Sequence, residues 1–481
     1  MNTPDRRTRS ARIDEKSMHS SGNTSVGIKS NQAQEDSLDI SLSPANSLKY
    51  TGQVDLTPDE RWYLEFFRQN TSMQCAGYFY DEFWQRLVHQ VSDTQPAVCH
   101  AVIAMGSLNY RFLRSRMGGI SEPLNTAFPL QQCNKAIVHL RQNLTNGHMT
   151  RLRMETALVT CVILVSMMLL QEDAQSAGRH LRSGYKLLED YLREAPHPSS
   201  TGFALSQALA GINLGWLSFS SSDSATEDGD GSFACFRPMA HSHSETLDDI
   251  QRASNFLLTL APLVLSGNAK RFQTAQFDID SEAHAILGKL RGWRNQVQRL
   301  SMHDPIRLSQ RDLDALTLLE IWSEALYIIL MVKTASLSLE NNYDEYLPRF
   351  QNVVSLAKKL LTSDPSQTSL PKFSVNMGII PPLFFCAFRC RDWLVRQEAL
   401  LLLRRWRRQE GIWSSGTTAL ILKRVIEIES DGLTPEDPIP EMSRIVSIDV
   451  ELCPPDSKLC LRYRRGCNIE ANPWTLEMLA H

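Results

Sequence analysis

Apolar residues recur every three or four positions, in one segment after another, between residues 57 and 440 of this chain. That spacing places them along one face of a helix, so each segment is expected to form an amphipathic α-helix. No apolar–polar alternation of the kind seen in strands interrupts the segments up to residue 192, and no repeat of fixed length is present. The pattern predicts a mostly α, multi-helix domain rather than a solenoid.

The first predicted helix begins in the stretch LTPDERWYLEFFRQN. Thr57 is a good N-cap, Pro58 suits the first helical position, and Glu60 completes a capping box. Trp62 and Phe66 then follow at helical spacing.

The remaining helices are predicted from the same periodicity. One of them is expected to have Thr246 as its N-cap, with Asp248 and Asp249 in its first turn. The predicted helices span residues 92–113, 129–144, 157–170, 177–192, 246–265, 281–300, 311–338 and 342–362.

The most apolar run, ALVTCVILVSMMLL at residues 157–170, has fourteen residues. A bilayer requires roughly 20, so a buried core helix is expected here and no membrane association. The basic start of the chain lacks the apolar stretch of a secretory signal, which predicts an intracellular protein with reduced cysteines.

The pattern changes to strand alternation near the C-terminus. Val446, Ile448 and Val450 fall on one side of the first stretch, and Leu459 and Leu461 on one side of the second. The turn residues CPPDSK lie between them, so a β-hairpin is predicted to close the helical domain.

Composition divides the chain further. Residues 1–50 contain ten serines and few large apolar residues, which predicts a disordered tail. Within that tail Arg6, Arg7, Arg9 and Arg12 form either a nuclear localisation signal or an ordinary basic tail. The predicted parts are a tail at 1–50, a first helical half at 51–220, an acidic and polar insert at 221–245, a second helical half at 246–440, and a hairpin with C-terminal tail at 441–481.

One segment, residues 381–413, combines two cysteines with seven arginines. Cys386 and Cys390 are four residues apart, but a structural zinc site needs four ligands, usually in Cys-x-x-Cys pairs. No such pair occurs among the ten cysteines of the chain. We therefore expect no metal site and no other cofactor.

The arginines of this segment raise the alternative of a nucleic-acid-binding helix. The formal net charge of the chain is −3, so such contacts would need a local patch. Val395, Ala399, Leu402 and Trp406 form an apolar stripe at helical spacing, which predicts a core helix with the arginines on its flanks and outer face. Asp392, Glu398 and Glu410 are expected to pair with some of these arginines.

The same segment resembles the C-terminal part of the fungal-specific transcription factor regulators. The front half is similar to the family too, in blocks within residues 64–109, 130–144 and 177–191, and the likeness runs from about residue 55 to about 465. The residues that carry the resemblance in the segment are Pro381, Pro382, Cys390, Arg391, Asp392, Arg396, Ala399, Leu402, Leu403, Glu410, Gly411 and Trp413.

Regulators of this family commonly carry a six-cysteine binuclear zinc cluster ahead of the helical domain, and residues 1–74 contain no cysteine. No position matches the DNA-reading module, so no sequence-specific DNA binding is expected from this chain alone. The resemblance implies a nuclear co-regulator of fungal metabolic or secondary-metabolite genes. Its expected partners are other proteins, through a transcription factor or self-association, and a small-molecule effector is a further candidate.

Catalytic patterns are missing from the sequence. It has no Gly-x-Ser-x-Gly elbow, no phosphate-binding glycine loop and no His-Glu-x-x-His, and residues 241–245 (HSHSE) are expected to be an exposed loop. We therefore predict no catalytic residues and no enzyme. The alternative is a helical small-molecule-binding protein or an enzyme of a fungal biosynthetic pathway, with a pocket between helices.

Overall fold

A computed structural model describes most of the chain after residue 54, and residues 51–481 form one compact unit. The described residues are 55–116, 127–145, 148–194, 199–219, 249–265, 276–302, 308–335, 340–362, 372–453, 458–466 and 473–479. The predicted tail at 1–50, with its four arginines, and the predicted insert at 221–245 lie outside them.

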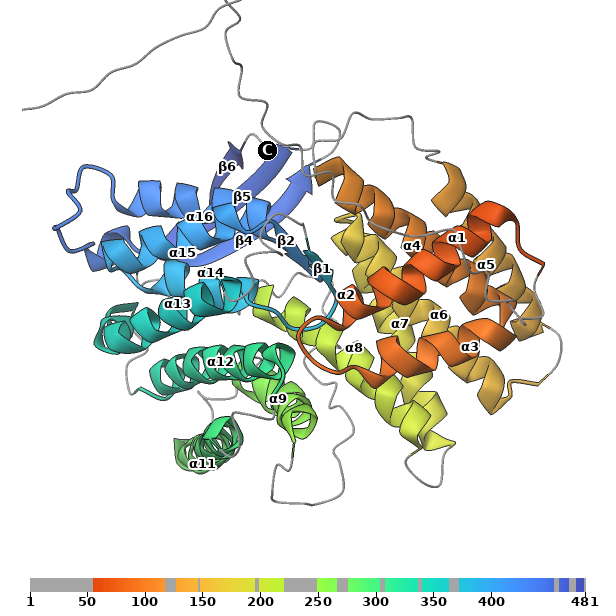
Figure 1. Ribbon diagram of the computed structural model, residues 1–481. Helices are drawn as coiled ribbons and strands as arrows, with labels where there is room; N and C mark the ends of the chain where they lie inside the picture. Colours follow the sequence, from red (N-terminus) through yellow and green to blue (C-terminus); the bar gives the residue numbers. More distant parts are fainter. Residues whose placement is uncertain are drawn as a thin grey trace, which may run out of the picture. The chain divides into compact units, whose positions relative to one another are not determined.

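In the described part of the first half of the unit, all the regular elements are helices (Figure 1). Its central helix α4 packs against α1, α3, α5 and α6, and α6 packs against α7. The elements are α1 (Pro58–Phe66), η1 (Phe67–Thr71), α2 (Ser72–Ala76), η2 (Phe83–Leu87), α3 (Val88–Thr94), α4 (Pro96–Arg116), α5 (Ala127–Thr145), α6 (Arg151–Leu170), α7 (Ala174–Arg193) and α8 (Ser200–Phe219).

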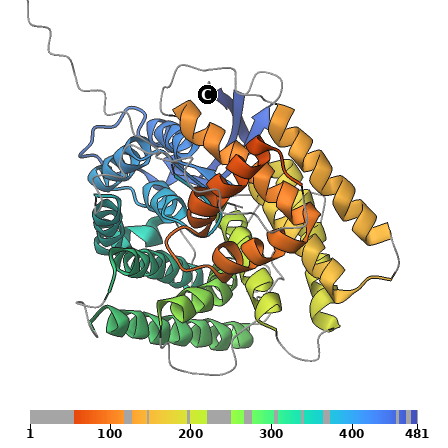
Figure 2. The same cartoon turned by 45° about the vertical axis from the view of Figure 1, so that its right-hand side comes forward.

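The second half continues with helices and adds two small sheets. Helices α9, α11 and α12 pack against one another, as Figures 1 and 2 show, and α13 to α16 follow. The helical elements are α9 (Ile250–Leu265), α11 (Gln276–Met302), α12 (Gln310–Thr334), η4 (Glu340–Tyr346), α13 (Leu347–Thr362), α14 (Ile380–Arg389), α15 (Trp393–Arg405), α16 (Ser415–Glu429) and η6 (Glu441–Ser443).

Helix α8 connects the two halves. It contacts α6 and α7 on one side and α9 and α14 on the other. In Figure 1 it runs between the orange and yellow helices of the first half and the green and blue helices of the second. Its residues Leu205, Leu209 and Leu214 are buried, so the core is continuous across both halves.

The start of the first helix is as the sequence predicts. The Thr57 hydroxyl accepts from the Glu60 N–H at 3.3 Å, and the Glu60 carboxylate accepts from the Thr57 N–H at 2.9 Å. Phe66 is fully buried, while Trp62 remains partly exposed against Tyr110.

The start of α9 differs from the prediction. The helix begins at Ile250, after Asp249, whose carboxylate accepts from the Arg252 N–H at 2.6 Å. Asp249 therefore caps this helix, while Thr246 lies outside the described residues.

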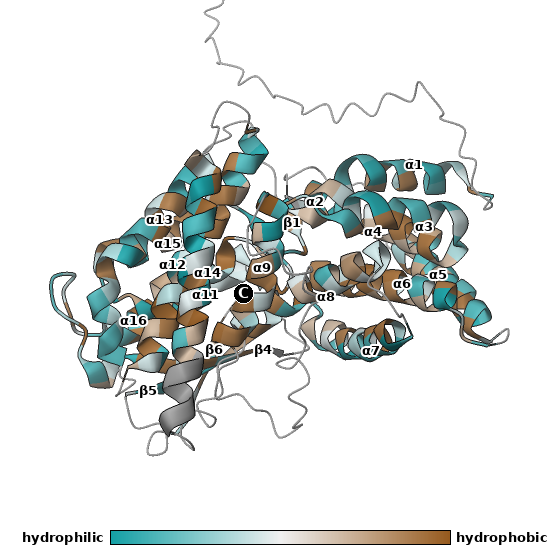
Figure 3. Ribbon diagram, turned by 90° about the horizontal axis from the view of Figure 1, so that it is seen from below, coloured by the Kyte–Doolittle hydropathy of each residue, from teal (hydrophilic) through white to brown (hydrophobic). Residues whose placement is uncertain are grey.

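Burial, rather than length, distinguishes a core helix from a membrane-spanning helix for the most apolar helices. Among the described helices, α6 and α12 are both long and apolar enough to cross a membrane. The run at 157–170 is only part of the 20-residue α6, so the length of fourteen residues does not exclude a membrane-spanning helix. In both helices most of the apolar stretch is buried inside the fold, which favours core helices. Other helices, such as α7, carry both hydrophilic and hydrophobic residues around their surface (Figure 3).

The predicted hairpin is present and belongs to a larger sheet. Strands β4 (Ile445–Cys453) and β5 (Lys458–Arg465) pair antiparallel, with Ile448 opposite Tyr463 and Val450 opposite Leu461. A third strand, β6 (Thr475–Leu479), adds to the other edge of β5 and was not predicted. The mostly α fold with a C-terminal hairpin is thus confirmed.

A second sheet combines one strand that precedes the segment 381–413 with two short strands at the end of that segment. Strand β1 (Lys372–Ser374) pairs parallel with β2 (Arg408–Glu410), which pairs antiparallel with β3 (Trp413–Ser414). Strands of two or three residues are too short to show an alternating pattern, which is why the sequence did not predict them.

Candidate functional site

The segment at 381–413 folds into α14, α15 and the strands β2 and β3. Pro381 lies in the first turn of α14, where a missing N–H costs nothing. Asp392 caps α15 by accepting from the Val395 N–H at 2.9 Å. The predicted stripe Val395, Ala399, Leu402 and Trp406 is buried, as expected for a core helix.

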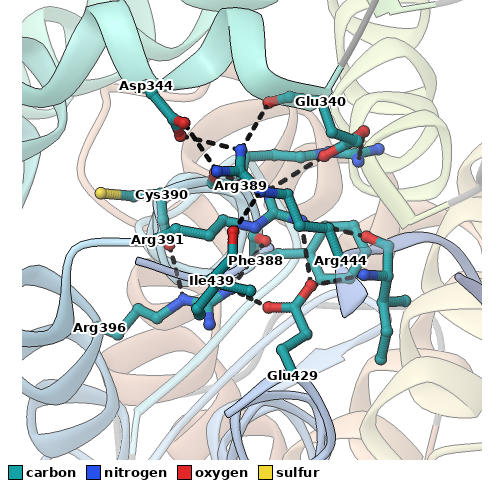
Figure 4. A network of polar contacts seen from close by, with 11 residues as sticks. Glu340, Asp344, Phe388, Arg389, Cys390, Arg391, Arg396, Glu429, Ile439 and Arg444 are labelled. Carbon is teal, nitrogen blue, oxygen red and sulfur yellow. Dashed lines mark hydrogen bonds and ion pairs between the residues drawn. The ribbon is translucent and has the colours of Figure 1, made fainter. Parts of the chain in front are cut away.

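A buried group of charged side chains, here called the ionic cluster, lies beside these helices (Figure 4). The ionic cluster contains four guanidinium groups and three carboxylates, so it carries one excess positive charge. Its members are Glu340, Asp344, Arg389, Arg391, Arg396, Glu429 and Arg444.

Glu429, from α16, is the central carboxylate of the ionic cluster. One of its oxygens pairs with Arg396, and the other lies 3.0 Å from Arg391 and accepts from the Ile445 N–H at 2.5 Å. Burial alone would raise the pKa of Glu429, but the charges of Arg396 and Arg391 and the hydrogen bond from Ile445 hold this pKa below 4.5. The carboxylate therefore stays ionised and ties α15 and α16 to β4.

The ionic cluster also joins more distant elements. Arg444 donates both Nη atoms to Asp344 at 3.0 and 2.7 Å, and Arg391 lies 3.1 Å from Glu340, which also pairs with Arg389. Elements η4, α14, α16 and the start of β4 are thus held by ion pairs whose arginines are largely shielded from water, whereas Asp344 at the edge of the cluster is 46% exposed.

This arrangement corrects the prediction that the arginines lie mainly on flanks and outer face. The side chains of Arg391 and Arg396 are only 4% and 1% exposed. Arg404, Arg405 and Arg407 are exposed, as predicted. The apolar periodicity could not reveal the difference, because the partners of the buried arginines come from residues 340 and 429.

The three acidic residues that were predicted to pair with the arginines have three different roles in the structure. Glu410 lies 3.3 Å from Arg408, whereas Glu398 pairs with Lys358 and Asp392 serves as a helix cap. The Glu410 carboxylate also accepts from the Ile380 N–H at 2.7 Å, at the N-terminus of α14. A Cβ at Gly378 would lie 2.0 Å from this carboxyl group, so only glycine fits there.

Residues 408–413 connect the two halves. Arg408 lies over the Tyr78 ring at 5.1 Å, and Gln409 donates to the Leu169 carbonyl at the end of α6. Trp413 donates to the Gly215 carbonyl of α8 at 3.0 Å. The segment is therefore a structural junction rather than an exposed binding surface.

A cavity of about 250 Å³ lies near this junction. Residues 79–83, helices α8 and α9, and residues 376–377 form its wall. The lining combines aromatic, amide and acidic side chains: Phe79, Tyr80, Asp81, Glu82, Phe83, Phe203, Ala204, Gln207, Asp249, Gln251, Arg252, Ser254, Asn255, Leu258, Asn376 and Met377.

Hydrogen bonds from both halves fix the wall of this cavity. Asn376 donates to Asp81 at 2.5 Å and to the Ala76 carbonyl at 3.3 Å. Arg311 of α12 donates to the Phe79 carbonyl at 2.6 Å. Burial is the main cause that raises the pKa of Asp81 above 3.8.

Comparison with known proteins decides the family. The model of the fungal specific transcription factor domain matches residues 63–425, which is more than half of the chain.

The chain belongs to the fungal-specific transcription factor domain family.

This confirms the resemblance seen in the sequence. The chain is also similar to the Aspercryptin biosynthesis cluster-specific transcription regulator atnN of Emericella nidulans, at 41% identity over 51 residues. That match spans 11% of this chain and 8% of the relative. No solved structure matches the chain.

The sequence also raised the questions of a metal site at two cysteines and of a localisation signal in the N-terminal tail. Cys386 and Cys390 are both buried, and burial raises the pKa of both thiols, to about 11 for Cys390. Among the described residues, no three His, Cys, Asp or Glu side chains form a group that could hold a metal ion. Arg6, Arg7, Arg9 and Arg12 and the stretch at 241–245 lie outside those residues.

The sequence analysis allowed for a pocket between helices but could not place the cavity. Its walls come from four separate segments of the transcription factor domain, and none of them carries a local ligand-binding motif. A polar residue inside an apolar segment was the one available signal, as at Asp81 and Asn376.

Proposed function

We propose that this chain is a nuclear co-regulator of transcription for genes of a fungal biosynthetic pathway, and that it acts through contacts with other proteins. The match of the fungal specific transcription factor domain to residues 63–425 carries the proposal. The similarity over 51 residues to a cluster-specific regulator supports the choice of biosynthetic genes.

The proposal of a co-regulator role is supported by the DNA-binding features that can be found within these 481 residues. The sequence contains no Cys-x-x-Cys pair, and the family reads DNA with a zinc-held helix that needs such pairs. Arg391 and Arg396 are occupied by Glu429, so they cannot contact phosphates. The exposed Arg404, Arg405 and Arg407 can supply only weak, salt-dependent attraction.

Two assays test this function. In a gel-shift experiment at physiological salt, the 481-residue chain should retard DNA weakly and without sequence preference. Replacing Arg404, Arg405 and Arg407 by alanine should remove this weak retardation. Transcript profiling of a deletion strain should show a coherent set of biosynthetic genes with changed expression. Tight binding to one DNA sequence, or an unchanged transcriptome, would contradict the proposal.

Nuclear import can be tested in the same strain. A fluorescently tagged chain should accumulate in the nucleus, and alanine at Arg6, Arg7, Arg9 and Arg12 should shift it to the cytoplasm if these arginines are the localisation signal. The triple alanine variant at positions 404, 405 and 407 is the control for lost positive charge, and it should remain nuclear.

The cavity supports a second candidate function, a small-molecule-binding protein or enzyme of a biosynthetic pathway. Its aromatic and polar lining is typical of ligand pockets. Loss of a metabolite from the deletion strain, with unchanged transcripts, would support this second candidate function.

A further inference from the structure

We propose that the cavity between residues 79–83, α8, α9 and residues 376–377 binds a small organic cation: an ammonium group attached to a single aromatic or aliphatic ring system. This goes beyond the proposed function, because the binding itself requires neither DNA nor a protein partner.

The size of the cavity limits the ligand. Its 250 Å³ is far more than the roughly 15 Å³ that one water needs, and slightly less than the roughly 300 Å³ at the lower end for drug-sized ligands. One ring with a short side chain fits this volume, whereas a large polycyclic metabolite does not.

The charge of the lining favours a cation. Three acidic residues, Asp81, Glu82 and Asp249, line the cavity together with one basic residue, Arg252. The Asp249 and Arg252 groups approach to 4.0 Å, and Glu82 pairs with Arg86 outside the lining. The Asp81 carboxylate accepts hydrogen bonds from two neutral groups, the Asn376 amide and the Trp84 N–H, and interacts electrostatically with the Arg311 guanidinium, which is itself hydrogen-bonded to backbone carbonyls. An ammonium group would compensate the charge of this carboxylate.

The apolar part of the lining selects the rest of the ligand. Phe79, Phe83 and Phe203 supply aromatic rings, and Leu258 and Met377 supply aliphatic surface. Aromatic faces attract cations as well as rings, so the same wall serves both parts of the molecule.

The wall is built before a ligand arrives. Asn376 and Arg311 fix residues 76–81 by hydrogen bonds. Helix α8 approaches closely enough that a Cβ at Gly211 would lie 2.4 Å from the Asn376 amide oxygen. A ligand would touch both halves of the fold at once, so binding should stabilise the whole unit against unfolding.

Calorimetric titration with matched probes tests the proposal. We expect 2-phenylethylamine and tryptamine to bind with micromolar to millimolar dissociation constants. The uncharged 2-phenylethanol should bind at least about tenfold more weakly than 2-phenylethylamine, and the anion 3-phenylpropanoate should not bind. Absence of binding by both amines at millimolar concentration, or equal affinity for amine and alcohol, would overturn the proposal.

Variants locate the binding site. Asp249→Asn keeps a good helix cap but removes a charge at the cavity, so it should weaken amine binding by about three- to tenfold. Asp173→Asn is the matched control, because Asp173 caps α7 in the same way and does not line the cavity. Ala204→Phe should fill the cavity and abolish binding. If both Asp→Asn variants bound amines with the affinity of the unmodified chain, the site assignment would be wrong. This conclusion would hold whether or not Ala204→Phe folds and binds amines.

Discussion

Arg396 and Glu429 are separated by 33 residues in the chain and form an ion pair whose side chains are 1% and 0% exposed. The Arg396 guanidinium also donates to the Cys390 carbonyl at 2.6 Å, which fixes the turn between α14 and α15. Arg396 therefore joins α15 both to α16 and to the turn that precedes α15.

Removing the charge of Glu429 should destabilise the fold strongly. Glu429→Gln leaves Arg396 buried without a counter-charge and leaves Arg391 with Glu340 alone, and breaking a buried pair in this way costs about 3–5 kcal/mol. Urea unfolding measures the change. Glu427→Gln on the same helix is the control, since Glu427 pairs with Lys423 and Arg424 at the surface, and it should cost less than about 1 kcal/mol. Similar losses in the two variants would show that the ionic cluster does not hold the fold together.

Glu60 should make stability depend on pH in acid. Burial opposes ionisation, but hydrogen bonds from Lys135, Thr57 and Gln132 outweigh it and lower the pKa of Glu60 from 4.5 to about 2. Between these values the unfolded chain binds more protons than the folded one, so this contribution is complete above pH 4.5 and is lost as the pH falls toward 2. Glu60→Gln should reduce the slope of unfolding free energy against pH in that window, by up to about 1.4 kcal/mol per pH unit.

The partner of Glu60 provides a second test of the same effect. Lys135 lies 2.6 Å from the Glu60 carboxylate and is itself largely exposed. Lys135→Met should move the pKa of Glu60 back toward 4.5 and flatten the same part of the pH profile. Urea unfolding at several pH values between 3 and 5 measures both variants. An unchanged slope in both would contradict the assignment.

Two glycines should respond to alanine with opposite signs. A Cβ at Gly378 would lie 2.0–2.4 Å from the Glu410 carboxyl group, so Gly378→Ala should cost about 1–3 kcal/mol or more through overpacking. A Cβ at Gly292 in α11 would meet nothing within 4 Å, so Gly292→Ala should stabilise by about 0.5–1 kcal/mol through helix propensity. Thermal unfolding measures both. A tolerated alanine at position 378 would mean that Glu410 does not occupy this place.

The core stripe of α15 can be tested against its outer face. Trp406 is 7% exposed, and Trp406→Ala should cost about 3–5 kcal/mol. Arg404 on the same helix is exposed, and Arg404→Ala should cost less than about 0.5 kcal/mol. Chemical unfolding compares the two variants, and a larger loss for the arginine would contradict the placement of the helix.

Local rules predicted most of the helices because each rule acts within one or two turns. The Thr57–Glu60 capping box, the stripe from Val395 to Trp406 and the pairing of Val450 with Leu461 depend on neighbours close in sequence. The third strand β6 was missed because the sequence between residues 466 and 475 gives no hairpin signal of the usual kind.

The candidate site could not be predicted in the same way. Asp81, Asn376 and Arg311 meet although more than 200 residues separate Asp81 from each of the other two. No local sequence motif around these three residues marks a ligand site. The sequence therefore suggested a pocket between helices only in general terms, as part of the alternative function.

The sequence by itself determined the helical class, the family and the absence of known catalytic motifs, because periodicity and motif spacing are properties of the linear chain. Only the tertiary structure decided which arginines of the segment 381–413 are buried and which are exposed. The physical reason is the high free-energy cost of a buried charge. Arg396 can leave water only because Glu429 arrives from another helix, and that meeting is fixed by packing rather than by any neighbour in the sequence.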